Sequence, residues 1–148
     1  MTAKDLSLYG MDHIDAGLKL FQNPIHLDSG GYLIHIGFEC LLKGWWLELQ
    51  GTINEGHDLN VIANKIPDLQ SLPTDIQQIL SVVNDYSKLR YPNHQSPVEV
   101  GTDQLEDIYK LLDFIRSKMP RHLHTRDPAF PITKGKRLLM KKKIDQTN

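Results

Sequence analysis

The chain has 148 residues with a formal net charge of −1, and 40% of the residues are apolar, 24% are charged and one is a cysteine. These values indicate one soluble globular domain with its own core, and they exclude collagen-like, disordered and disulfide-stabilised proteins. No apolar run approaches the roughly 20 residues of a membrane span, the N-terminus lacks the pattern of a secretory signal, and the single Cys40 favours a reducing compartment, so we expect a cytoplasmic protein.

Five segments have the apolar spacing of helices, and none shows the alternation of a strand. The clearest covers about 28–50, where Ile34, Phe38, Leu41, Trp45 and Leu49 form one apolar stripe and Gly51 can end the helix. The others cover roughly 7–21, which Gly10 and Gly17 weaken, and then 57–65, 74–88 and 102–118.

The connections between these segments are mostly short, which makes consecutive helices antiparallel neighbours. We therefore predict an all-α protein, an up-and-down bundle of four to five helices over residues 1–120. Residues 121–148 are predicted to form a basic C-terminal extension.

The central helix carries a polar strip of His35, Glu39 and Lys43, spaced four residues apart on one face. One interpretation is a Glu39–Lys43 ion pair on the helix surface, and the other is a groove that binds a phosphate or a base. Metal ligation needs at least three ligands, and no other helix offers a matching pair, so we predict no metal site and no cofactor.

His57 and Asp58 form a second local pattern, directly before a helix. A His-Asp pair occurs in metal-dependent phosphohydrolases, but those sites need further His and Asp ligands that we cannot assign here. We favour a local cap, because an aspartate at a helix N-terminus interacts well with the helix dipole.

The segment Arg90-Tyr91-Pro92-Asn93-His94 opens the only long predicted loop. Arginine can bind a phosphate, tyrosine can stack on a base and histidine can move a proton, a combination that suits metal-independent RNA cleavage. The alternative is a helix-ending motif, in which Arg90 pairs with an acidic neighbour and Tyr91 packs on the core.

The charges are divided unevenly along the chain. Residues 1–115 hold 7 Lys+Arg and 16 Asp+Glu, whereas residues 116–148 hold 10 Lys+Arg and 2 Asp+Glu. A basic tail with Lys136 and Arg137 often contacts phosphates. Simple solvation of the tail, or its packing on the acidic body, explains the composition equally well.

Three stretches in this order, YLIHIGFECLLKGWWLELQG, HDLNVI and DYSKLRYP, resemble the HEPN family (higher eukaryotes and prokaryotes nucleotide-binding domains). The resemblance covers roughly residues 9–118, and Glu39 and Lys43 match the family's central-helix pattern. It implies an all-α bundle, commonly a homodimer, that binds nucleotide or RNA. Many members cleave RNA in toxin–antitoxin, defence or RNA-processing systems, with an Arg and a His at a somewhat longer spacing than Arg90 and His94.

Two hypotheses follow. In the first, the chain binds nucleotide or RNA and is a metal-independent ribonuclease in which Arg90 stabilises the phosphate and His94 moves protons. The binding residues are then His35, Glu39, Lys43, Tyr91, Lys136 and Arg137. In the second, the chain is a non-catalytic dimeric interaction module that partners a small nucleotidyltransferase.

Overall fold

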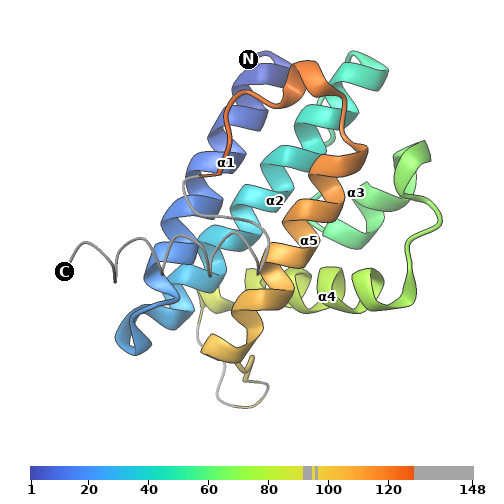
Figure 1. Ribbon diagram of the computed structural model, residues 1–148. Helices are drawn as coiled ribbons and strands as arrows, with labels where there is room; N and C mark the ends of the chain where they lie inside the picture. The colour runs from blue at the N-terminus through green and yellow to red at the C-terminus, as the bar shows by residue number, and fades with distance from the viewer. Residues whose placement is uncertain (92–94, 96, 129–148) are drawn as a thin grey trace, which may run out of the picture.

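The computed structural model describes residues 1–91, 95 and 97–128, and all regular structure in these residues is helical (Figure 1). Five α-helices pack against each other, which confirms the predicted all-α bundle. They are α1 (Ala3–Leu20), α2 (Leu27–Gln50), α3 (Leu59–Lys65), α4 (Thr74–Asp85) and α5 (Leu105–Lys118), and the short 3-10 helices are η1 (Pro24–His26), η2 (Pro67–Leu69), η3 (Tyr86–Arg90), η4 (Thr102–Gln104) and η5 (Arg121–Leu123). No helix in these ranges is long and apolar enough to cross a membrane.

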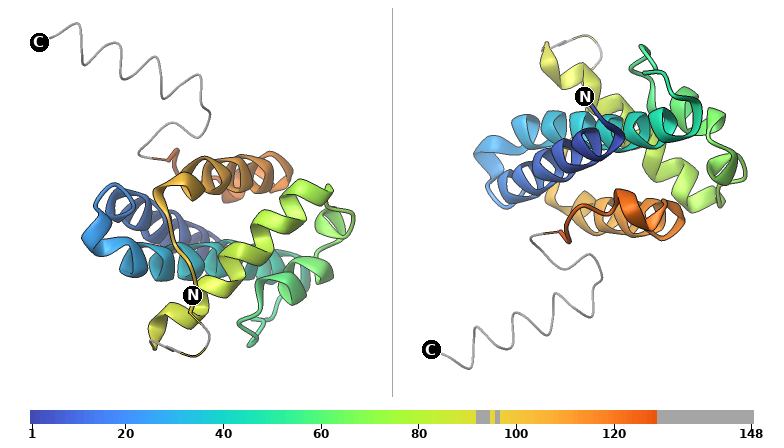
Figure 2. Two further views of the ribbon diagram at one scale, coloured as in Figure 1. Left: turned by 90° about the horizontal axis from the view of Figure 1, so that it is seen from below. Right: turned by 90° about the horizontal axis from the view of Figure 1, so that it is seen from above.

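The antiparallel helices α1 and α2 lie unusually close to each other, side by side along most of α1 (Figures 1 and 2). Small residues meet in three pairs, Ala3 with Gly44, Gly10 with Gly37, and Gly17 with Gly30. A Cβ atom on Gly10 would lie 2.7 Å from the carbonyl oxygen of Gly37, and one on Gly17 would lie 2.7 Å from that of Gly30. The glycines that weaken α1 in isolation therefore allow the two backbones to touch.

The first helix also begins earlier than its apolar pattern predicts. Thr2 and Asp5 form a reciprocal capping box, in which each side chain accepts a hydrogen bond from the other's backbone N–H. This cap satisfies two N–H groups that the helix itself leaves without partners, so it stabilises the first turn.

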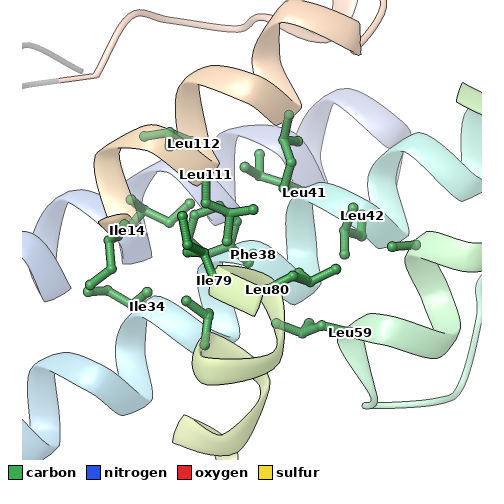
Figure 3. Packing of buried hydrophobic residues seen from close by; sticks show 14 of the residues in the cluster. Ile14, Ile34, Phe38, Leu41, Leu42, Leu59, Ile79, Leu80, Leu111 and Leu112 are labelled. Atoms are coloured by element: carbon green, nitrogen blue, oxygen red, sulfur yellow. The ribbon is translucent and has the colours of Figure 1, made fainter. Parts of the chain in front are cut away.

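The apolar stripe of α2 forms the centre of the core. Ile34, Phe38, Leu41 and Trp45 are buried as predicted, and labelled side chains from α1, α4 and α5 lie around Phe38 (Figure 3). Leu49, the last predicted member of the stripe, is 46% exposed because the final turn of α2 lies outside the core. Gly51 ends α2 with a φ of 74°, a left-handed conformation that glycine adopts without strain.

The helices α3 and α4 pack beside α2, and α4 crosses α2 and α5 obliquely (Figure 2). Asp58 is the N-cap of α3, where its carboxylate accepts a hydrogen bond from the backbone N–H of Val61 at 3.1 Å. This bond confirms the interpretation of Asp58 as a local cap.

After α5 the chain turns back and packs against α1. Leu123 is fully buried, and its carbonyl oxygen accepts a hydrogen bond from Ser7 Oγ at 2.5 Å. The Arg126 guanidinium lies 2.7 Å from an oxygen of Asp12 and 2.5 Å from one of Asp15. Residues 121–128 of the predicted extension therefore contact the bundle, whereas residues 129–148, with Lys136 and Arg137, lie outside the described residues.

Candidate functional site

Ionisable side chains from two separate parts of the chain meet on the polar face of α2. Glu39 Oε1 lies 2.7 Å from Nδ1 of His57, which precedes α3, and 3.9 Å from Lys43 Nζ. We call Glu39, Lys43 and His57 the Glu39 cluster. The predicted Glu39–Lys43 ion pair is present, and a histidine from the neighbouring loop joins it.

The two charged members of the Glu39 cluster are largely shielded from water. The side chains of Glu39 and Lys43 are 14% and 12% exposed, whereas that of His57 is 77% exposed. Removing a charge from water is unfavourable unless a partner compensates it, so each charge depends on the other more than in an exposed pair. The cluster is thus a partly buried ion pair with a histidine at its solvent side.

The hydrogen bond from His57 to Glu39 fixes the position of one proton on the imidazole. An ionised carboxylate can only accept, so Nδ1 of His57 must carry the proton and donate it. The opposite nitrogen, Nε2, belongs to an exposed ring and forms no hydrogen bond within the described residues. A carboxylate that orients a histidine in this way is a common arrangement for acid–base chemistry and for binding polar ligands.

His35 lies one helical turn before Glu39 on the same face of α2, and its side chain is buried. Burial lowers the pKa of His35, and the charge of Glu39, the backbone of His57 and the side chain of Asn84 oppose this shift. Its Nε2 atom has no hydrogen-bond partner among the described residues. The predicted binding residue His35 therefore lies under the site, as a neutral side chain, rather than at its surface.

Asn84 and Asp58 hold the loop that carries His57. Asn84, near the end of α4, accepts a hydrogen bond from the backbone N–H of Leu59 at 2.8 Å, next to the Asp58 cap. The bond to Asn84 attaches the start of α3 to α4, and the Asp58 cap holds the first turn of α3, so that together they place His57 against α2. The pattern of the sequence indicates the cap but contains no local signal for the contact of His57 with Glu39.

Arg90 and Tyr91 lie at the end of η3 and are both exposed. The Arg90 Cζ atom is 5.3 Å from the centre of the Tyr91 ring, and Tyr91 is 71% exposed, so it does not pack on the core as the helix-ending alternative expects. Within the described residues no ion pair involves Arg90, and no hydrogen bond or ion pair joins Arg90 or Tyr91 to the Glu39 cluster. His94 lies outside the described residues.

The described residues also contain no group of three or more His, Cys, Asp or Glu side chains arranged to hold a metal ion. Comparisons of the chain with protein-family models, with curated proteins and with solved structures found no match.

Proposed function

We propose that this chain is a HEPN-like domain that binds a nucleotide or single-stranded RNA, and that the Glu39 cluster is part of its binding surface. The observation that carries the proposal is the oriented imidazole of His57, which is exposed and held by the shielded carboxylate of Glu39. Such a ring is fixed before a ligand arrives, so less conformational entropy is lost on binding.

The chemistry of the His57 ring suits both parts of a nucleotide. When Nε2 carries a proton, it can donate a hydrogen bond to a phosphate oxygen. When Nε2 is unprotonated, it can accept a hydrogen bond from the amino group of a base. The exposed ring of Tyr91 offers a face for base stacking, and Lys136 and Arg137 of the tail supply charge for the phosphates.

A binding assay tests this proposal with a fluorescent single-stranded RNA of mixed sequence and with ATP and GTP as competitors. We expect His57→Gln and Glu39→Gln to weaken binding about tenfold, the effect of a lost hydrogen bond to a charged group. His26→Gln is the matched control, because His26 is an exposed histidine whose side chain forms no cap bond at the start of α2. Absence of binding, or equal binding by His57→Gln and wild type, would reject the site.

The proposal includes a catalytic form, in which Arg90 and His94 cleave RNA without a metal. The 2′-hydroxyl attacks the adjacent phosphorus, His94 accepts its proton, Arg90 stabilises the phosphate charge, and the 5′-oxygen leaves and takes a proton from water. Wild-type protein with excess chelator should then leave a cyclic phosphate, and Arg90→Ala, Arg90→Lys or His94→Ala should each lower the rate about 100-fold.

Intact RNA in that assay would favour the non-catalytic alternative, a dimeric module that partners a small nucleotidyltransferase. Sedimentation of the full chain tests the homodimer that both forms of the proposal include. A monomer at about 100 μM, a concentration well above the dissociation constants of stable dimers, would exclude a dimer of useful stability.

A further inference from the structure

A cleft of about 290 Å³ lies between α4 and α5 and shares no residue with the Glu39 cluster. Its floor is apolar, because Ile79 and Val83 of α4 face Ile108 of α5 there, next to the ring of Tyr86. A floor of buried aliphatic side chains with one aromatic ring is typical of sites for small organic molecules.

Two polar contacts join α4 to α5, one towards each end of the cleft. Lys110 Nζ lies 2.5 Å from an oxygen of Asp75, at the start of α4. The hydroxyl group of Tyr86, just after α4, donates a hydrogen bond to Gln104, just before α5. The two helices are thus linked on both sides of the space between them.

The charge around the cleft is negative. Three charged residues line it: Lys110 pairs with Asp75 and also interacts electrostatically with Asp107, so one negative charge remains in excess. The Asp107 carboxylate has no hydrogen-bond or ion-pair partner in the part of the chain that the structure describes, and Asp103 lies nearby. Burial raises the pKa of Tyr86, and the charges of Asp103 and Asp107 raise it further, so both carboxylates act on the interior of the cleft.

We propose that the α4–α5 cleft binds a small organic ammonium ion, with its cationic group on Asp107 and its apolar body on Ile79, Val83 and Ile108. The excess negative charge of the lining attracts a cation and repels an anion, and the apolar floor favours a ligand that carries a hydrocarbon group. A volume of about 290 Å³ is at the lower limit for ligand sites and suits a one-ring molecule rather than a nucleotide. The cleft is thus a second site, independent of the proposed nucleotide surface.

Phenethylamine and 3-phenylpropionate form a matched pair of probes, because they share a phenyl ring on a two-carbon chain and differ in the sign of the charge. Each probe is titrated to about 20 mM into uniformly labelled full-length protein, because fragments of this size bind in the millimolar range. Binding is measured by NMR from the shifts of the amide resonances of α4 and α5. We expect saturable shifts with phenethylamine and much weaker ones with 3-phenylpropionate. Equal binding of both probes, or no saturable shift with phenethylamine, would overturn the proposal.

Variants on α5 test the role of the carboxylate. Asp107→Asn should weaken phenethylamine binding about fivefold or more, whereas Asp113→Asn, an exposed aspartate on the same helix outside the cleft, should leave it unchanged. Circular dichroism confirms that each variant is folded, and a folded Asp107→Asn protein that binds phenethylamine as wild type does would refute the assignment.

Discussion

Replacing Gly37 with alanine tests whether the close contact of α1 and α2 holds the bundle together. A Cβ atom at this position would lie 2.4 Å from Ile14 Cγ1 and 2.8 Å from the backbone oxygen of Gly10. Ile14 is fully buried, and the Gly10 oxygen belongs to a helix backbone, so neither can move without the rest of α1. The two helices must therefore separate by several tenths of an ångström or more.

Two opposing effects decide the sign of the change in stability. Alanine in place of glycine favours the helix by about 1 kcal/mol, whereas overpacking a tight contact costs typically about 1–3 kcal/mol. The cost should be near its upper value here, because separating the helices also loosens the contacts at Gly17 and Gly44. We expect the free energy of unfolding, measured by urea titration with circular dichroism, to fall by roughly 1–2 kcal/mol.

The matched control is Gly31→Ala in the same helix. There the nearest atom to an added Cβ is Leu89 Cδ1 at 2.7 Å, the end of a flexible side chain, and the next nearest atom is 3.5 Å away. Leu89 can turn aside, so the helix propensity of alanine should offset most of the cost. A Gly37→Ala variant as stable as wild type, or no less stable than Gly31→Ala, would show that the backbone contact of α1 with α2 does not restrict this position.

Two further predictions concern pH and salt. Burial lowers the pKa of His35 from its ordinary value of 6.5. As the pH falls, the unfolded chain therefore protonates His35 before the folded protein does. The free energy of unfolding should consequently fall as the pH drops below 6.5. Urea titrations at pH values from about 7.5 to about 5.5 should show a smaller fall for His35→Gln, and an equal fall would contradict the assignment. If the tail contacts RNA, deleting residues 134–143 should lower the salt dependence of RNA affinity by about 0.7 in logarithmic slope for each lost phosphate contact, whereas an unchanged slope would show that the tail is only solvated.

The core of the fold could be predicted because it depends on local periodicity. The spacing of Ile34, Phe38, Leu41 and Trp45 on α2 requires a partner on one face, and the structure supplies that partner from every other α-helix. Leu49 departs from the pattern because periodicity alone does not show where a helix extends past its neighbours.

The role of the glycines could not be read from either helix alone. Gly10 and Gly17 lower the helix propensity of α1, which is their only local effect. Their seven-residue spacing is matched by that of Gly30, Gly37 and Gly44 on α2, but the match has meaning only once the two helices are paired in antiparallel register. The same glycines that weaken α1 as an isolated helix thus allow it to pack closely against α2.

The candidate site shows the same division between local and distant information. The Glu39–Lys43 pair follows from a spacing of four residues, and the structure contains it. His57 is 18 residues from Glu39 along the chain, and its position depends on the Asp58 cap and on the bond from Leu59 to Asn84. Because this contact depends on how α3 and α4 pack, no periodic pattern in the sequence predicts it.

The two faces of α2 have separate roles, and this separation connects the fold to the site. A helix turns by about 100° per residue, so Glu39 points roughly 200° around the axis from Gly37. Accordingly α1 lies on one side of α2, and α3 with the loop before it lies on the other (Figure 1). A change at the glycine contact therefore acts on the packing of α1 against α2, whereas a change at Glu39 or His57 acts on the polar face of α2, which α1 does not cover. The rotation of α2 about its own axis, which the close fit to α1 fixes, determines the direction in which Glu39 holds the imidazole of His57.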